Sequence, residues 1–348
     1  MNYIGSKLSL LEFIDESLTS LVGESLHDNM MLCDIFAGTN VVGSYFKNKG
    51  YSVISNDIQT FGFYLGKVLI ENNELLNFEK LNQIGIDNPF NYLNKLKGRQ
   101  GFIFKNYTLE GTKNQEYQRQ YFTEENAKKI DAIRLKINYW NKNGLLSDKE
   151  YYYLVASLVE SADKIANTAS VYEAFLKKIK SSAQKELILK PLDLNVQNGK
   201  NTYFACNEDG EKLIKHIHGD VLYMDPPYNN RKYDTNYHIL ETIALYDNPK
   251  IKGKTGVRCE QSKKSNFCIK KLAPQALENI VKDANFKYIL LSYNNEGIIP
   301  IEKIEEIFSR YGKYSRFEKN HRRFKADNSR EYSTDHTIEY IHCLVKEN

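Results

Sequence analysis

The stretch "MMLCDIFAGTNVVGSYFKNKGYSVISNDI", residues 30–58, decides the fold. It begins as a short buried strand that ends in glycine, and residues 41–50 then have the apolar spacing of a helix that closes on Gly50. Residues 51–58 form a second apolar strand. Because strand, helix and strand follow one another directly, we expect two parallel strands joined by a right-handed crossover.

The turn after the first strand has most of a nucleotide-binding pattern. Gly38, Asn40 and Gly43 stand where G-x-G-x-x-G would place its three glycines. Asparagine tolerates left-handed backbone angles, so the tight turn is retained, but its side chain counts against the pyrophosphate of NAD. Asp57 ends the second strand, where a carboxylate can accept from ribose hydroxyls. This combination fits S-adenosylmethionine, and a turn that binds no ligand is the alternative.

The rest of the chain continues the alternation, with one helical interruption. From about Glu124 to Lys190 the residues are rich in Lys, Glu, Leu and Tyr, which predicts an insertion with helices over 125–140, 148–166 and 170–185. Strand and helix patterns then resume, and 314–325 and 337–346 read as two strands around a basic turn. The expected fold class is α/β, built on a parallel sheet with a largely helical insertion.

Composition excludes several other classes. The 348 residues are 41% hydrophobic with a net charge of +4, which is ordinary for a globular protein. No apolar stretch approaches a membrane span and the N-terminus lacks signal-peptide features, so we expect a cytoplasmic protein with no membrane partner. Five cysteines without a CxxC pair, and no HExxH, indicate neither a disulfide framework nor a metal site.

Positive charge is concentrated in two segments, 248–264 and 313–325. In the second segment aromatic residues alternate with the lysines and arginines. Such patches suit contacts with nucleic-acid phosphates. A solvated loop or hairpin is an equal alternative for each segment.

The stretch "MDPPYNN", residues 224–230, places an acid, two prolines and a ring directly after the buried strand "DVLY". Folds of this class bind ligands at the carboxyl ends of parallel strands. The exocyclic amine of a base is a poor nucleophile, because the ring delocalises its lone pair. Asp225 and the carbonyl of Pro226 can accept its N–H groups and favour a pyramidal nitrogen, while Tyr228 can stack on a flipped base. A strand-ending turn without chemistry is the alternative.

Six segments in order resemble the Dam-type DNA adenine-N6 methyltransferases, which use S-adenosylmethionine and often serve restriction–modification systems. The resemblance spans essentially the whole chain and implies a Rossmann-like methyltransferase sheet. It would assign residues 1–84 and 196–348 to the catalytic domain, and 85–195 to a mainly helical insertion that is a candidate target-recognition region. The segments are "MNYIGSK", "DIFAGTNVVG", "SNDI", "NEDGEKLI", "MDPPYNNR" and "LLSYNNEG".

The resemblance also implies roles for individual residues. The N-terminal cofactor motif would be Tyr3, Gly5 and Lys7, with Lys7 neutralising the methionine carboxylate of the cofactor. Asp57 would hold its ribose. Further cofactor residues would be Phe36 and Gly38, together with Asp209 (or its neighbour Glu208) on the adenine amino group. The catalytic residues would be Asp225, Pro226, Pro227 and Tyr228.

The function expected from these features is methylation of adenine N6 at a short motif in double-stranded DNA. A cognate restriction endonuclease would be a functional rather than a physical partner, and a monomer is the default. Methylation of RNA adenine or of cytosine N4, a catalytically silent DNA-binding subunit and an NAD-dependent oxidoreductase are the alternatives. The recognition sequence is not readable, because specificity comes from side chains that contact base edges. The sequence does not show whether the helical insertion or the stretch after "MDPPYNN" carries them.

Overall fold

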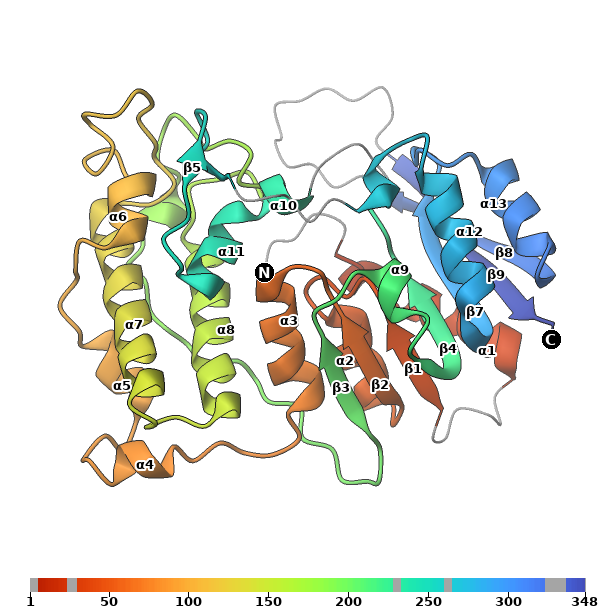
Figure 1. Ribbon diagram of the computed structural model, residues 1–348, viewed down its shortest axis with the longest axis horizontal. Coiled ribbons are helices and arrows are strands. Elements are labelled where there is room, and N and C mark those ends of the chain that lie inside the picture. Colours follow the sequence, from red (N-terminus) through yellow and green to blue (C-terminus); the bar gives the residue numbers. More distant parts are fainter. Residues whose placement is uncertain (1–5, 24–29, 228–232, 260–264, 323–335, 348) are drawn as a thin grey trace. The chain divides into compact units, whose positions relative to one another are not determined.

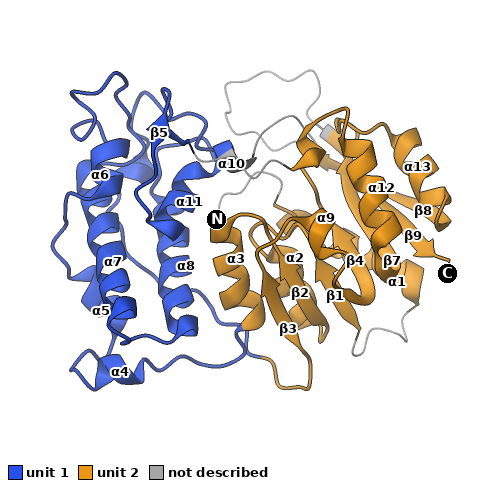
Figure 2. Cartoon of the chain, in the orientation of Figure 1, with its two compact units in different colours: residues 1–4, 72–196, 234–262 blue, residues 5–71, 197–233, 263–348 orange. Residues whose placement is uncertain are grey.

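A computed structural model describes residues 6–23, 30–227, 233–259, 265–322 and 336–347. The chain forms two compact units (Figure 2). Unit 1 comprises residues 1–4, 72–196 and 234–262, and unit 2 comprises residues 5–71, 197–233 and 263–348. Unit 1 therefore contains, besides the expected helical region, a segment that follows the "MDPPYNN" stretch.

Unit 2 is built on a seven-stranded sheet with the order β3-β2-β1-β4-β7-β9-β8 (Figure 1). The first five strands are parallel, and β9 is antiparallel to both β7 and β8. The expected α/β fold on a mainly parallel sheet is confirmed, and the last two predicted strands join the sheet as an antiparallel pair. The strands are β1 (Met31–Asp34), β2 (Ser52–Asn56), β3 (Tyr203–Cys206), β4 (His218–Met224), β7 (Asn285–Asn294), β8 (Gly312–Arg322) and β9 (His336–Lys346).

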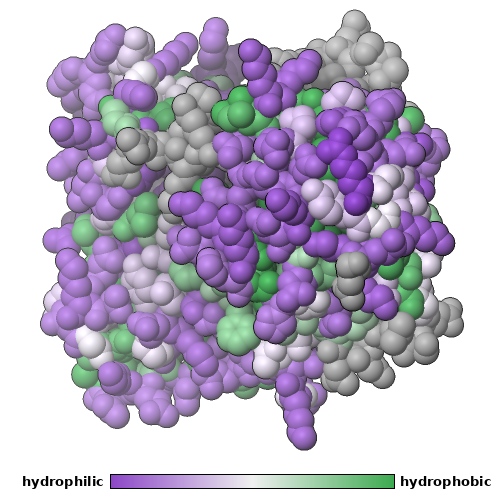
Figure 3. All heavy atoms as spheres, turned by 45° about the vertical axis from the view of Figure 1, so that its right-hand side comes forward, coloured by the Kyte–Doolittle hydropathy of each residue, from purple (hydrophilic) through white to green (hydrophobic). Residues whose placement is uncertain are grey.

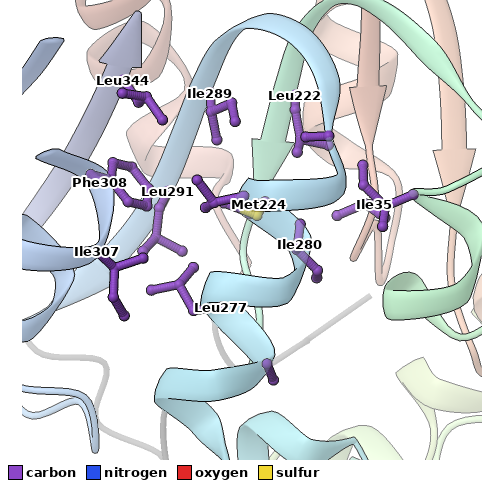
Figure 4. Close-up of a cluster of buried hydrophobic side chains, with 14 of the residues drawn as sticks. Ile35, Leu222, Met224, Leu277, Ile280, Ile289, Leu291, Ile307, Phe308 and Leu344 are labelled. Atoms are coloured by element: carbon purple, nitrogen blue, oxygen red, sulfur yellow. The ribbon is translucent and has the colours of Figure 1, made fainter. Parts of the chain in front are cut away.

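Helices cover both faces of this sheet. Side chains of α1 (Leu11–Val22) and α2 (Val41–Asn48) pack on one face, and those of α9 (Gly210–Leu213), α12 (Ala273–Asp283) and α13 (Ile301–Ser309) pack on the other. Figure 4 shows the second core, where side chains of α12 and α13 meet those of β4 and β7. Each such buried aliphatic side chain contributes about 1.5–3 kcal/mol to folding.

Polarity changes abruptly at one end of the central strands. In β4 the side chains from Val221 to Met224 are buried, and the next residue is Asp225. In β7 the buried run from Tyr288 to Leu291 gives way to Ser292 and Asn294. Strands that are covered on both faces are apolar along their length, so polar residues at their carboxyl ends mark a place where the sheet meets something other than its own core.

Unit 1 contains two long helices, α7 (Glu124–Lys142) and α8 (Asp148–Lys164). The hydroxyl of Thr123 caps α7 by accepting from Asn126 N, and Ser147 and Glu150 form a capping box at the start of α8. The other elements are α4 (Glu79–Asn82), α5 (Pro89–Asn94), α6 (Phe102–Tyr107), α10 (Tyr233–Asn236), α11 (His238–Leu245), β5 (Ile251–Lys252) and β6 (Val257–Arg258).

The third helix expected in the insertion, over 170–185, is absent apart from a short 3-10 turn at Ser181–Gln184. The backbone turns left-handed at Ser170, with φ +72°, which interrupts a helix at its start. Asn167 then donates to Leu176 O and accepts from Lys180 N, and the hydroxyl of buried Tyr172 donates to Asp163 Oδ1. These tertiary contacts override a helical spacing of apolar residues that has no intrinsic capping signal.

Among the described residues no helix has both the length and the apolar character needed to cross a membrane. On the face of the molecule drawn in Figure 3, hydrophilic side chains predominate and hydrophobic ones form small separate spots. Isolated exposed apolar residues of this kind are normal on a globular protein.

Candidate active site

Two acids from neighbouring strands meet at the carboxyl end of the sheet in unit 2. Asp34 ends β1 and is aligned in the parallel ladder with Tyr223 of β4. Asp225 lies two residues beyond Tyr223 and therefore projects on the same face of the sheet as Asp34. The charge of Asp225 raises the pKa of Asp34, which reflects this proximity.

Asp225 is paired with Lys7. Lys7 Nζ lies 2.9 Å from Asp225 Oδ1, and the two side chains are only 5% and 18% exposed. Burial raises the pKa of Asp225 to about 6, although the charge and hydrogen bond of Lys7 oppose that rise. At neutral pH the carboxylate is therefore ionised but more basic than an ordinary aspartate. The sequence pattern joins Lys7 to the cofactor and does not anticipate this ion pair.

Asp34 is more deeply buried, with 1% of its surface exposed. Burial is the largest cause of a pKa raised to about 8, and the charges of Asp225 and Asp57 add to it. Its Oδ1 atom has no hydrogen-bond partner among the described residues. A buried polar atom without a partner is unfavourable, so this oxygen is suited to a donor supplied by a bound molecule. Sequence reasoning missed Asp34, because it reads only as part of a strand.

The turn between β1 and α2 is held by the side chain of Asn40. The residue adopts φ +63°, as expected from its tolerance of left-handed angles. Asn40 Nδ2 donates to Gly62 O at 2.9 Å, and Ser55 Oγ donates to Asn40 Oδ1. A Cβ atom at Gly62 would lie 2.9 Å from Gly38 O. The missing glycine of the pattern is thus replaced by a residue that ties the turn to α3 (Thr60–Gly66) and β2.

Asp57 stabilises the same turn. Its Oδ2 accepts from Gly38 N and its Oδ1 accepts from Gln59 N, each at 2.7 Å. The second bond satisfies a backbone donor just before α3. Both oxygens retain lone pairs, so the predicted contact with a ribose is compatible with these bonds and stays a prediction.

Asp209 follows β3 and Phe36 follows β1, and the two segments meet at the start of α9. Asp209 is the N-cap of α9, where its Oδ1 accepts from Glu211 N at 2.9 Å, and Glu208 is exposed. The ring of Phe36 packs edge-on against Phe267 at 5.3 Å. A Cβ at Gly210 would come within 3.2 Å of the Phe36 ring. The glycine therefore permits the close approach of α9 to the ring.

The end of β7 and the beginning of the antiparallel strand β9 supply the last part of the site. Tyr293 belongs to the core formed with α12 and α13, and its hydroxyl accepts from Ile299 N, so it is a packing residue. Ser292 and Asn294 lie on the opposite face, and Asn294 is aligned with Glu339 of β9. Sequence reasoning also missed Glu339, because a lone acid in the last strand carries no motif.

The remaining predicted site residues are described less fully. Tyr3, Gly5 and Tyr228 lie outside the described residues. Pro226 is buried and Pro227 is partly buried, directly after Asp225. The structure thus brings together Lys7, Gly38, Asp57, Asp225 and Asp34 at one end of the sheet.

The charge of this site discriminates between cofactors. Asp225 and Asp57 act electrostatically on Asp34, and Glu339 acts on Asp225. Lys7 is a cation that acts on Asp225 and Glu339. A carboxylate-rich site repels the pyrophosphate of NAD. S-adenosylmethionine fits it better, because its sulfonium and ammonium groups outnumber its carboxylate. The unpartnered oxygen of Asp34 and the glycine turn fit the same molecule.

The sequence matches one protein family over most of its length. The family model for D12 class N6 adenine-specific DNA methyltransferases matches residues 3–307. The matched range includes the glycine turn, Asp225 and all five points at which the chain passes between unit 1 and unit 2.

Individual relatives give the same picture. The chain is 43% identical to the type II methyltransferase M.NlaIII of Neisseria lactamica, with 99% of each chain covered. It is 40% identical to the type II methyltransferase M.FokI of Planomicrobium okeanokoites, of which it spans 53%. It is 33% identical to the type II methyltransferase M.CviAII of Paramecium bursaria Chlorella virus 1, with 94% of this chain and 93% of the relative covered.

Proposed function

The chain belongs to the D12 class of N6 adenine-specific DNA methyltransferases, and from that premise we propose that Asp225 is its catalytic carboxylate. The family establishes the reaction: S-adenosylmethionine is the methyl donor, adenine N6 in DNA is the acceptor, and the enzymes serve restriction–modification systems. This decides between the acceptors considered from the sequence. The observation that supports Asp225 is its buried, cation-paired carboxylate at the end of β4.

Asp225 would act by holding the amino group of the target adenine. One N–H of that group donates to the Asp225 carboxylate and the other to the Pro226 carbonyl, which frees the nitrogen lone pair for the methyl group. When the new N–C bond forms, the amine carries an extra proton, and a carboxylate with a pKa of about 6 can accept it. Tyr228 is the residue proposed to stack on the flipped base.

The cofactor would be held by residues of the neighbouring strand ends. Phe36 and Gly38 would flank it, Asp57 would bind its ribose, and Asp209 would accept from its adenine amino group. The Asp34 oxygen that lacks a partner among the described residues would accept from its ammonium group, and the positive charge of Lys7 would attract its carboxylate. Bound there, S-adenosylmethionine supplies an electrophilic methyl group.

We propose that unit 1 contributes DNA contacts through the hairpin formed by β5 and β6. Lys250, Lys252 and Lys254 are exposed on it. Its turn is anchored from inside unit 1: Arg119 donates to Gly253 O, the Tyr107 hydroxyl donates to Gly256 O, and His238 Nε2 lies 3.1 Å from Thr255 O. A rigid hairpin with exposed lysines suits phosphate contact, which positions a protein on DNA. The role of residues 85–195 in target recognition is a proposal of the same kind.

The remaining expectations about partners are also proposals. A DNA substrate follows from the family, whereas its double-stranded form, a monomeric state, a cytoplasmic location and a separately encoded restriction endonuclease stay predictions. The recognition motif of this chain is to be measured rather than transferred from a relative.

The test is single-molecule sequencing of plasmid DNA from cells that express wild type, Asp225→Ala or Asp220→Ala. Asp220 is an exposed acid at the other end of β4, so it controls for loss of a carboxylate from the same strand. We expect N6-methyladenine at one short motif with wild type and Asp220→Ala, and none with Asp225→Ala. Unmodified DNA with wild type would contradict the function, and methylation by Asp225→Ala would contradict the assigned residue.

A further inference from the structure

Another carboxylate stands beside the Lys7–Asp225 pair. Glu339 of β9 is only 7% exposed and pairs in the strand ladder with Asn294 of β7. Its Oε2 atom is buried and has no hydrogen-bond partner within the described ranges. A desolvated carboxylate of this kind is costly unless a cation is near, so its surroundings need a positive charge.

Asn294 fixes the orientation of this carboxylate. Asn294 Oδ1 accepts from Glu296 N at 3.0 Å, which directs the Nδ2 group toward β9. There Nδ2 lies 3.5 Å from Glu339 Oε1. Asn294 itself is 6% exposed, so both of its polar ends are used inside the protein rather than presented to a base.

Lys7 contacts Asp225 directly, with Nζ 2.9 Å from Oδ1, and acts on Glu339 over a longer range. Its charge lowers the pKa of Asp225 and also that of Glu339, in each case against the rise caused by burial. The charge of Glu339 in turn raises the pKa of Asp225.

The strand register independently relates the positions of the two carboxylates. Tyr223 of β4 is aligned with Leu290 of β7, and Asn294 of β7 is aligned with Glu339 of β9. Because side chains two residues apart lie on the same face of a sheet, Asp225 and Glu339 are on one face near the carboxyl end of β7.

We propose that Glu339 is a positioning residue for methyl transfer, which holds the ammonium group of Lys7 between two carboxylates and so prevents Lys7 from neutralising Asp225 completely. Asp225 then keeps enough basicity to take a proton from the methylated amine. This inference rests on the proposed role of Asp225. It gives a function to a carboxylate that no sequence motif marks.

The other titratable groups near Asp225 and Glu339 determine whether another residue could replace Lys7 as the cation. Asp34 on β1 and Tyr223 on β4 face Asp225, and Glu296 after β7 faces Glu339. All three are acids. His321 on β8 also lies within the field of Lys7, but burial lowers its pKa, so it does not replace Lys7 as the cation at neutral pH. A change at Glu339 leaves each of them in place.

The test is the pH dependence of kcat/KM for DNA methylation by purified wild type and Glu339→Gln, because this parameter reports groups of the free enzyme. Glutamine keeps the size of the side chain and the contact with Asn294 but removes the charge. Asp225 should become more acidic, so the acidic limb of the profile should move to lower pH by roughly 0.5–1 pH unit. A merely structural role would lower the rate without moving the limb.

Glu318→Gln is the matched control. Glu318 is an exposed acid on β8, opposite Tyr340, the residue that follows Glu339. Its variant should keep the wild-type limb. An unmoved limb in folded Glu339→Gln, or an equal shift in Glu318→Gln, would overturn the inference. Absence of methylation by wild type would instead contradict the proposed function.

A second pair of variants covers the case in which Glu339→Gln does not fold. Removing both partners of a buried charge pair is tolerated better than removing one, so Lys7→Met/Glu339→Gln is compared with Lys7→Met. Lys7→Met should move the acidic limb to higher pH, and adding Glu339→Gln should bring it back toward lower pH. No difference between these two variants would also overturn the proposal.

Discussion

Two buried aspartates, one in each unit, differ in how many hydrogen-bond donors surround their carboxyl groups. Asp131 in α7 of unit 1 accepts from Gly101 N, Ile103 N and Phe104 N, each at 2.9 Å, and from the hydroxyl of Tyr246 at 2.7 Å. Asp34 in unit 2 is as well buried, but one of its oxygens has no partner within the described residues. Both pKa values are raised by burial.

The difference separates a structural carboxylate from one that awaits a ligand. Asp131 exchanges water for four protein donors and thereby fixes the start of α6. Asp34 keeps one oxygen without a donor in the described part of the chain and lies close to two other acids, which is an arrangement that a protein retains where a ligand binds. Burial alone would not have distinguished the two sites.

The largest expected effect is on catalysis. Asp225→Asn should reduce the methylation rate by about 100-fold or more, because the amide accepts one N–H less strongly and cannot take the proton. The thermal unfolding temperature should change little, because removal of a buried negative charge offsets the loss of the counter-ion of Lys7. Asp220→Asn on the same strand should methylate normally. Rate measurements together with thermal unfolding check both parts, and a large drop in unfolding temperature would make Asp225 resemble Asp131.

Asp131→Ala should show the opposite behaviour, with loss of stability as the primary effect. Three backbone N–H groups and the Tyr246 hydroxyl would be left without their acceptor, at a cost of about 3–5 kcal/mol. Urea unfolding and amide hydrogen exchange at Ile103 and Phe104 measure this. Unchanged exchange at both amides would contradict the structural role.

Asp34 should make the protein less stable as the pH rises. Its pKa is about 8 in the folded chain and near the ordinary aspartate value when unfolded, so the folded state holds the extra proton between those values. The free energy of unfolding should therefore fall by up to about 1.4 kcal/mol per pH unit from roughly pH 4 to 8. In Asp34→Asn this decline should be flatter. An equally steep decline in the variant would contradict the assignment.

The smallest expected effect concerns the hairpin of unit 1. Lys250→Gln/Lys252→Gln/Lys254→Gln should weaken DNA binding at low salt and reduce the slope of log affinity against log salt by about 0.9 for each phosphate that is no longer neutralised. The matched control is Lys95→Gln/Lys97→Gln/Lys142→Gln, which changes two exposed lysines that follow α5 and one at the end of α7. Fluorescence anisotropy over a salt series measures both. Equal slopes in the two triple variants would show that the hairpin does not touch DNA.

Local sequence patterns predicted the sheet of unit 2, because all of them indicate the same fold. The alternation around residues 30–58, the glycine turn and the strand before Asp225 all point to parallel strands with a ligand at their carboxyl ends. Asn40 could be understood from its backbone preference alone, and the structure adds the bonds of its side chain to Gly62 and from Ser55.

What the sequence could not supply were contacts between distant segments. The absent helix over 170–185 depends on the bonds of Asn167, and the pairing of Lys7 with Asp225 joins the N-terminal segment to the end of β4. Glu339 has no motif around it and is identified only by the β9 register. Such partners follow from tertiary packing, which no periodicity encodes.

The order of strands has a consequence in time. β9 is synthesised after β8 but lies between β7 and β8 in the sheet. During translation, therefore, β7 keeps an open hydrogen-bonding edge and β8 has no neighbour until β9 enters between them. β9, which fills this gap, also carries Glu339, so this part of the candidate active site is completed only when β9 pairs with β7 and β8. A nascent chain with the glycine turn and Asp225 already folded would still lack the residue that we propose sets the basicity of its catalytic carboxylate.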